Sequence, residues 1–396
     1  MKQSTGALNG VRVLDLSRIL AGPTCTQLLG DLGADVIKIE KPQSGDDTRQ
    51  WGPPFVQNVA GENTQESAYY LAANRNKRSV AIDISTVEGA AKVRKLARHC
   101  DILVENFKVG GLAKYGLSYD DLKEECPKLV YCSISGFGQT GPNAKLPGYD
   151  IMAQGFSGIM SITGEPNGEP MKVGVGIADV MCGMYASTAV LAALRHRDQT
   201  GEGQQIDLAL VDASIAWLVN EGTNYLTSNK APQRRGNQHP NIVPYQVFST
   251  RNGHIIIAVG NDAQYQRFCA VIEHPELASD GRFNTNAQRL NNRDALIELL
   301  SEYLLDFDSV ELLDALQKNG VPVGPVNTLS DVFSSEQVAA RDMKITMSHP
   351  QAGSGSVDLI GNPLKFSKTP ISYRHAPPAL GADTEQVLRE LLNETE

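Results

Sequence analysis

Signals that direct a protein out of the cytoplasm are missing from this chain of 396 residues. Its beginning, MKQSTGALNGVRVLDLS, has neither the apolar core of a signal peptide nor the Arg- and Ser-rich amphipathic pattern of a transit peptide. No window holds the roughly 18 uninterrupted apolar residues that a transmembrane helix needs. We therefore expect a cytoplasmic protein without a membrane partner.

Metal-binding and disulfide patterns are missing as well. The 6 cysteines show no CxxC spacing, and the 7 histidines are scattered. His99 and Cys100 are neighbours, but no second pair follows at a zinc-binding spacing, so we expect no metal site. Unpatterned cysteines in a chain of this size are typical of reduced thiols.

A long basic run is also absent. The net charge is −9, and the densest basic stretch is ANRNKRS at 73–79. Because duplex binding needs a basic face, we expect no nucleic-acid partner. A small anionic ligand remains compatible with this charge, since a few local cations can outweigh a negative total.

None of three common catalytic signatures is found where its function would require it. The turn after the first expected strand reads SRILAGPTCTQLLGDLG, which contains no GxGxxG and disfavours a dinucleotide enzyme. There is also no Walker A sequence and no GxSxG. The function must therefore be inferred from the secondary-structure pattern and from individual residues.

Strand and helix patterns alternate over roughly the first third of the chain. Period-two alternation predicts strands at 11–17, 34–40, 79–85, 101–107 and 129–138, with helices at 22–34 and 87–100. This βαβ order predicts an α/β fold with a large, Rossmann-like open parallel sheet and helices on both faces. The Gly/Pro-rich stretch 140–178 predicts loops, 180–197 predicts a helix, and 203–220 a strand running into a helix.

The length and a change of composition predict a second, smaller domain. Residues 227–241 are polar and basic, typical of a linker or lid, and 245–260 predicts a hairpin turning at Asn252-Gly253. We expect a large domain over 1–227, a small α+β domain over 228–325, and a return to the large domain over 326–396.

One acid stands out in this pattern. Asp179 lies in VGIADVMCG (175–183), and carboxylates are uncommon in apolar surroundings unless they are paired or have a task. It is interpretable as the N-cap of the following helix or as a polar core residue. It is equally interpretable as a carboxylate held ionised at a helix N-terminus, close to small residues such as Ala178 and Gly183, that acts as a base or nucleophile.

A series of segments follows in a fixed order along nearly the full length of the chain. They include LDLSRILAGP (14–23), LGADVIKIEKP (32–42), GDDTRQWGPPF (45–55), NRNKRSVAIDI (74–84), DILVENF (101–107), SISGFGQTGP (133–142), GYDIMAQGFSG (148–158), ADVMCG (178–183) and GVPVGPVN (320–327). In these segments the sequence resembles the family III CoA-transferases, the CaiB/BaiF group. The resemblance implies an interlocked homodimer whose substrates are coenzyme A thioesters and small carboxylic acids. It also implies that no cofactor is permanently bound.

In that family the acid matching Asp179 is the catalytic nucleophile. Its carboxylate attacks an acyl-CoA, giving a mixed anhydride and CoA thiolate, and the thiolate then forms an aspartyl-CoA thioester. An acceptor carboxylate then attacks the aspartyl-CoA thioester, and the same steps in reverse order release a new acyl-CoA. Covalent catalysis of this kind divides one hard exchange into easier acyl transfers, without ATP or a metal.

The resemblance also implies the contacts to CoA. The matching residues are Arg18, Leu20, Ala21, Lys41, Ile82, Asp83, Ile84, Ser85, Asn106, Phe107, Lys108, Lys114, Ser135, Gly136, Phe137 and Gly138. Most formyl-CoA:oxalate sequences carry arginine where this chain has Lys41, and a lysine where it has Ser135. Taken singly, the lysines also fit solvated surface charges, and Leu20, Ile82 and Phe107 also fit plain core residues.

Three interpretations of the reaction and its substrate remain within this resemblance. The segment QRRGNQHPNIVP (233–244) lacks the glycine run of the formyl-CoA:oxalate enzymes and is similar to the succinyl-CoA:glutarate type. Arg234, Arg235 and His239 would then bind the far carboxylate of a dicarboxylic acid, although they also fit a solvated linker. A formyl-CoA:oxalate-type transferase is the alternative. An α-methylacyl-CoA racemase is disfavoured, because Tyr149 replaces the histidine of its GHD motif.

A protein of this fold that binds CoA without catalysis, or serves as a scaffold, is a third class of interpretation. The presence of Asp179 among small residues argues against it.

Overall fold

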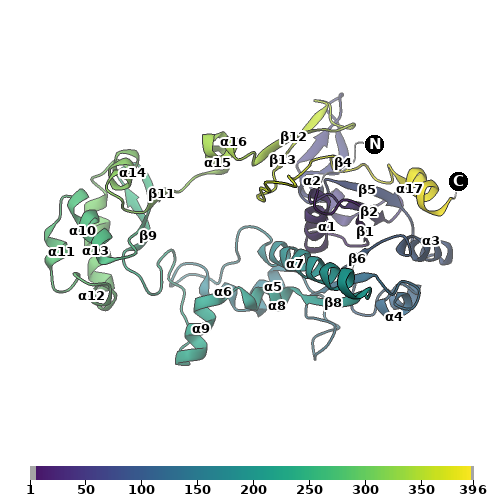
Figure 1. The fold of residues 1–396 in the computed structure, drawn as a ribbon. Helices are drawn as coiled ribbons and strands as arrows, with labels where there is room; N and C mark the ends of the chain where they lie inside the picture. Colours follow the sequence, from purple (N-terminus) through teal and green to yellow (C-terminus); the bar gives the residue numbers. More distant parts are fainter. Residues whose placement is uncertain (1–5, 394–396) are drawn as a thin grey trace. The chain divides into compact units, whose positions relative to one another are not determined.

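A computed structural model describes residues 6–393, and this part of the chain divides into two units (Figure 1). Among the described residues the large unit comprises 6–160, 172–230 and 337–393, and the small unit comprises Ser161–Met171 and Ala231–Glu336. The small unit therefore takes in the segment 161–171, which the sequence-based boundaries place in the large domain.

A six-stranded parallel sheet forms the centre of the large unit, in the order β5-β2-β1-β6-β7-β8. Its strands are β1 (Arg12–Asp15), β2 (Asp35–Glu40), β5 (Lys77–Ala81), β6 (Ile102–Glu105), β7 (Val130–Ser135) and β8 (Gln204–Ala209). Counted along the chain this is the order 3-2-1-4-5-6 of a doubly wound Rossmann-like sheet, which confirms the predicted fold class. The order reverses between β1 and β6, and ligands of such sheets bind beyond the carboxyl ends of the strands at that point.

Both faces of this sheet are covered, as the continuous apolar runs of its strands predict. Successive residues point to opposite faces, so Val13 joins one core with α1 (Ala21–Asp31) and α7 (Ile177–Thr200). Leu14 joins the other core with α3 (Val87–Ala97) and α17 (Thr384–Leu392) (Figure 1).

Smaller elements complete the large unit. They are the two-stranded pairs β3 (Phe55–Gln57) with β4 (Asn63–Ser67) and β12 (Lys344–Ser348) with β13 (Ser356–Ile360), the short helices η1 (Asp47–Gln50), α2 (Ala68–Ala72), η2 (Ala113–Tyr115) and α4 (Tyr119–Leu122), and helices α8 (Leu210–Ala216) and α9 (Val219–Ser228).

The small unit has the α+β character expected of it. A three-stranded antiparallel sheet, β11 (Val323–Pro325), β10 (Gly253–Ala258) and β9 (Tyr245–Thr250), shares one core with α10 (Asp262–Val271), α11 (Glu276–Ser279), α12 (Asn286–Asn291), α13 (Arg293–Leu304) and α14 (Ser309–Lys318). Helix α15 (Leu329–Ser334) follows, and α16 (Glu336–Ala340) begins at the boundary of the unit. Gly253 pairs with Thr250, so the hairpin turns at Arg251-Asn252, one residue earlier than predicted.

Two predictions around residue 160 are wrong in part. The stretch predicted as loops contains α5 (Asp150–Phe156) and α6 (Ile159–Ile162), because its apolar residues pack as short helices between the glycines. Helix α7 begins at Ile177, earlier than the predicted start at 180. Length and composition alone would let α7 cross a membrane, but a core helix passes the same test, and one side of α7 is buried in the core.

Candidate active site

Two adjoining pockets lie beyond the carboxyl ends of the strands, around the point where the sheet order reverses. Both are lined by Arg18, which follows β1, and by Phe107, which follows β6. The guanidinium carbon of Arg18 lies 5.5 Å from the centre of the Phe107 ring. These two side chains therefore stand between the pockets.

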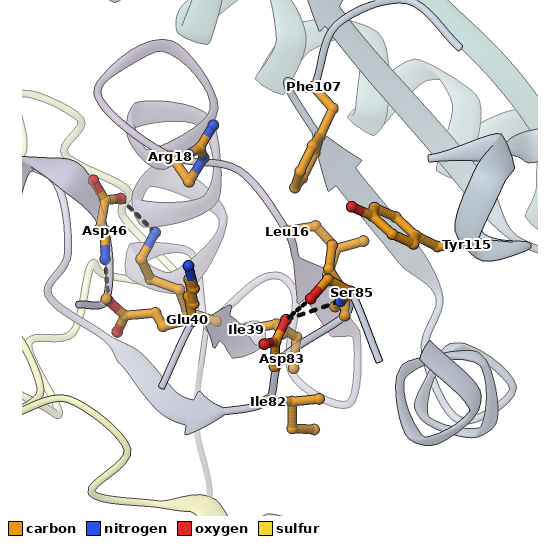
Figure 2. Close-up of a pocket in the computed structure, with 14 residues that line it drawn as sticks. Leu16, Arg18, Ile39, Glu40, Asp46, Ile82, Asp83, Ser85, Phe107 and Tyr115 are labelled. Carbon is orange, nitrogen blue, oxygen red and sulfur yellow. Dashed lines mark hydrogen bonds and ion pairs between the residues drawn. The ribbon is translucent and has the colours of Figure 1, made fainter. Parts of the chain in front are cut away.

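The first pocket has a volume of about 230 Å³ and combines apolar walls with cations. Figure 2 shows Phe107, Tyr115 and Leu16 on one side and Arg18, Glu40 and Asp46 on the other. Of the residues that the family resemblance implies, it brings together Arg18, Lys41, Ile82, Asp83, Ile84, Ser85 and Phe107. Lys114 lies outside it, in a neighbouring hollow that Ser85 and Tyr115 also line.

A buried ion pair supports the floor of this pocket. Lys38 and Asp46 have fully buried side chains, and the Lys38 ammonium donates to Asp46 at 2.9 Å and to the carbonyl of Ser17 at 2.8 Å. Burial raises the pKa of Asp46, but the Lys38 charge and the donors of Thr48 outweigh it and lower that pKa to about 2. The pair fixes the backbone just before Arg18.

The next residue along the chain has an unusual backbone. Ile19 has φ of 71°, a left-handed conformation that is a genuine outlier for a β-branched residue. Its N–H donates to the Asp46 carboxylate at 3.2 Å. Strain of this kind persists only where surrounding contacts hold it, and it is found mainly at functional sites.

The second pocket, of about 170 Å³, contains Asp179. Of the implied residues it brings together Arg18, Leu20, Ala21, Asn106, Phe107, Lys108, Ser135, Gly136 and Asp179. Asn106 lines it, but both ends of its side-chain amide are already used: Oδ1 accepts from the N–H of Arg18, and Nδ2 donates to the Arg18 carbonyl. Its role in the structure is to join the ends of β1 and β6.

Asp179 occupies the first turn of α7 and is not its N-cap, which is Gly176. The N–H groups that were expected to hold Asp179 ionised bind another carboxylate instead. Asp150 Oδ1 accepts from the N–H of Ala178 at 2.8 Å and from that of Asp179 at 3.3 Å. Burial, and then the charge of Asp150, raise the pKa of Asp179 to about 7.

The small residues near Asp179 have a packing role. Ala178 belongs to the hydrophobic core, and a side chain at Gly183 would meet the Ala21 carbonyl at 2.6 Å. These residues let α1 and α7 approach closely, and neither of them lines the second pocket.

A contact between two glycines shapes the far wall of the second pocket. A Cβ at Gly136 would lie 2.4 Å from the Cα of Gly148, so neither position accepts a side chain. Ser135 Oγ accepts from the N–H of Gly138 at 2.9 Å, which closes the turn. Phe137 points elsewhere, since its ring packs edge-on against Phe156 at 5.2 Å and against the core. Neither Phe137 nor Gly138 lines the pocket.

The residues expected to bind the acceptor acid belong to the small unit. Arg234 directs its guanidinium to the carbonyls of Glu165 and Gly168, so much of its donor capacity is used within that unit. The His239 ring lies 5.0 Å from the ring of Tyr245. Arg293 donates to the carbonyls of His239 and Pro240, and after burial the charge of Arg235 lowers its pKa.

Sequence reasoning missed several residues of the site. Lys38 and Glu40 line the first pocket from inside a strand, and a lysine in the apolar run DVIKIE was the available signal. In the sequence Asp150 stands out only as a member of the segment GYDIMAQGFSG (148–158). Its position at the start of a helix and its contact with α7 come from tertiary structure, and no local pattern could have shown them.

The fold and the site define an α/β protein with two adjoining pockets at the switch point of a parallel sheet, one lined by cations and the other by a carboxylate whose pKa is raised to about 7. A family model, CoA-transferase family III, matches residues 8–384, and the chain belongs to this family, which confirms the resemblance. It is a CoA-transferase whose substrates are CoA thioesters and carboxylic acids.

Individual relatives agree with this assignment. The chain is 49% identical to a succinate–glutarate CoA-transferase of Agrobacterium fabrum, over 97% of this chain and 95% of that protein. It is 43% identical to the succinyl-CoA:glutarate CoA-transferase of Homo sapiens, over 97% and 86% respectively. A CaiB/BaiF family crystal structure from Brucella suis superposes with a TM-score of 0.87 at 48% identity, covering 98% of this chain and 99% of that one.

Proposed function

We propose that this chain transfers CoA from a succinyl-CoA-like thioester to a dicarboxylic acid such as glutarate, and that Asp179 is the nucleophile. The observation that carries the proposal is the state of Asp179: only 9% of the residue is exposed, it lines the second pocket, and its pKa is raised to about 7. A desolvated carboxylate is more basic than a hydrated one and attacks a thioester more readily. The Agrobacterium fabrum and Homo sapiens relatives described above carry the same pair of acids in their names.

The reaction that we propose is the one that the family resemblance implies. The Asp179 carboxylate adds to the thioester carbonyl, and CoA leaves as a thiolate while an acyl-aspartyl anhydride forms. The thiolate then attacks the aspartyl carbonyl, so that the first acid leaves and aspartyl-CoA remains. Attack by the acceptor carboxylate and return of the thiolate complete the exchange. Because a thioester is both consumed and produced, the chemistry calls for no metal, ATP or resident cofactor.

The first pocket fits the nucleotide part of CoA. Its apolar walls suit an adenine ring, and Arg18 and Lys41 suit phosphate groups. The shared lining of Arg18 and Phe107 leads from this pocket to Asp179, a route for the pantetheine arm. Lys114 in the neighbouring hollow is a further phosphate contact in this proposal.

For the acceptor acid we propose Arg234, Arg235 and His239 as contacts to its distal carboxylate. Two arginines side by side, Arg235 and Arg293, form a positive site suited to the distal carboxylate of a dicarboxylic acid. Alanine at Arg235 should raise KM for the acceptor acid and leave KM for the CoA donor unchanged, whereas an equal rise in both would exclude this role.

The decisive experiment follows the acyl group onto Asp179. Wild-type protein is incubated with succinyl-CoA and glutarate, exchange is measured, and samples are trapped with hydroxylamine for peptide mass spectrometry. We expect glutaryl-CoA and a modification at Asp179, and neither in Asp179→Asn. Asp198→Asn is the matched control, because Asp198 is an exposed acid at the other end of α7. An active wild type without modification at Asp179 would exclude the mechanism.

The same assay separates the alternatives when the acids are varied. Preference for oxalate with formyl-CoA would indicate the formyl-CoA:oxalate type. Exchange of the α-proton with solvent would indicate a racemase, although Tyr149, which lines the second pocket, is a weak base for that task. Binding of CoA without either reaction would indicate a non-catalytic protein.

We also propose that the protein acts in the cytoplasm as a homodimer. The large unit exposes many large apolar side chains on α5, α7, α8 and α9 and at the end of α8, among them Ile151, Met152, Phe156, Met184, Tyr185, Leu191, Ile215, Trp217, Tyr225 and Leu226. Large exposed apolar areas are typical of interaction surfaces. Sedimentation should give a dimer mass, and Leu226→Glu should weaken association. A wild-type monomer at micromolar concentration would exclude the dimer.

A further inference from the structure

We propose that Asp150 is a positioning residue that makes Asp179 a stronger nucleophile, because it occupies the helix N–H groups that would otherwise solvate that carboxylate and adds a negative charge beside it. This inference rests on the proposed role of Asp179. Asp150 itself touches no reacting atom in the proposal and acts through Asp179.

The hydrogen bonds show that Asp150 binds N–H groups at the start of α7. Asp150 Oδ1 accepts from the N–H groups of Ala178 and Asp179, and Oδ2 accepts from the side-chain amide of Gln154 at 2.7 Å. Gln154 is held in turn, because its Oε1 accepts from the N–H of Val173 at 2.9 Å. Asp150 is therefore a fixed carboxylate with three donors, and these stabilise its charge.

The carboxylate of Asp179 differs from that of Asp150 in its hydrogen bonding. Within residues 6–393, no donor hydrogen-bonds to its carboxylate, which is buried and borders the second pocket. An acid in the first turn of a helix commonly reaches back to the free N–H groups there. Here those groups are taken by Asp150, so the lone pairs of Asp179 are left for a substrate carbonyl.

Other ionisable groups surround Asp179 and have to be considered. They are Tyr69 on α2, Cys182 on α7 itself, Arg18, Lys108 and Tyr149 in the pocket lining, and beyond Cys182 the side chains of Cys25 on α1, Cys132 on β7 and Asp212 on α8. Burial acts first on the pKa of Asp179 and the charge of Asp150 second. Removing the Asp150 charge should therefore lower the pKa of Asp179 only part of the way to its ordinary value.

The test compares the rate of Asp179 modification across pH in wild type, Asp150→Asn, Asp150→Ser and Asp150→Glu. Asparagine and serine keep an oxygen for the helix N–H groups without a charge, whereas glutamate keeps the charge. We expect the acid limb of the pH profile of the single-turnover rate to move to lower pH by about half a unit in both neutral variants. We also expect the plateau rate to fall about two- to tenfold, because a less basic carboxylate is a weaker nucleophile. Asp150→Glu should keep the wild-type acid limb.

A matched control is Asp308→Asn in the small unit, because Asp308 also accepts two helix N–H groups, those of Val310 and Glu311. Its pH profile should equal that of wild type. Folded neutral variants with an unmoved acid limb would overturn the inference, and so would failure of both neutral variants to fold, which would make Asp150 purely structural. A wild type never modified at Asp179 would instead overturn the proposed function, and this inference with it.

Discussion

Asn106 holds the backbone of Arg18 at both of its polar groups: its Oδ1 accepts from the Arg18 N–H at 2.9 Å, and its Nδ2 donates to the Arg18 carbonyl at 2.7 Å. Arg18 follows β1 and Asn106 follows β6, the two strands between which the sheet order reverses. One amide therefore joins the ends of these two strands beside the second pocket, which Asn106 also lines.

Alanine at position 106 removes both bonds. We expect KM for the acyl-CoA to rise about tenfold and the free energy of unfolding to fall by about 1–2 kcal/mol, since two hydrogen bonds are lost. Steady-state kinetics and urea unfolding measure these effects. Asn252→Ala is the matched control, because Asn252 makes a similar double contact to Asp308 and Ser309 in the small unit. It should affect stability without changing KM, and an unchanged KM in Asn106→Ala would contradict the role assigned here.

Asp179→Asn should stabilise the protein in a pH-dependent way. The folded pKa of Asp179 is about 7, above its ordinary value, so the native state resists ionisation that the unfolded state accepts. The wild type therefore loses stability as pH rises from about 4 to 7, and asparagine is free of this loss. We expect the difference in unfolding free energy to grow across that interval and level off at roughly 2–4 kcal/mol above pH 7. Thermal melts of both proteins between pH 4 and 8 measure it. A constant difference would show that Asp179 titrates normally.

Gly136→Ala should remove activity by opening the second pocket. The added methyl group would meet the Gly148 backbone at 2.4 Å, so the turn at 135–138 would have to shift by an ångström or more. A misplacement of this size costs on the order of 100-fold in kcat/KM. Gly281→Ala is the control, since a Cβ there meets nothing within 4 Å, and it should retain wild-type kinetics. Equal effects of both substitutions would indicate a general loss of stability.

Lys41→Ala tests the phosphate contact in the first pocket. Lys41 is exposed at the pocket rim, where an ammonium attracts phosphate through a partly screened interaction. We expect KM for acyl-CoA to rise about 5- to 20-fold with kcat unchanged, and the dependence of KM on salt to weaken. Lys365, also exposed, provides the control substitution. A salt dependence that stays the same in Lys41→Ala would exclude the contact.

Much of this architecture could be predicted because the relevant signals are local. Val13 and Leu14 show the period-two alternation that a strand covered on both faces needs, and the order of strands and helices predicted the doubly wound sheet. The prediction was wrong where packing overrides composition. The stretch 140–178 contains α5 despite its glycines and prolines, and α7 begins one turn earlier than its most apolar residues suggest.

The same distinction between local signals and long-range contacts applies to the site. The sequence by itself determined the α/β class, the family and the residue Asp179, because alternation, motif order and residue type are written along the chain. Only the tertiary structure decided that Asp150 takes the N–H groups of α7, that Asn106 binds the Arg18 backbone, and that Lys38 is paired with Asp46. These relationships join segments far apart in sequence, and burial and hydrogen bonding depend on which groups meet in space. For that reason the residue type of Asp179 could be read directly, whereas its high pKa and free lone pairs could not.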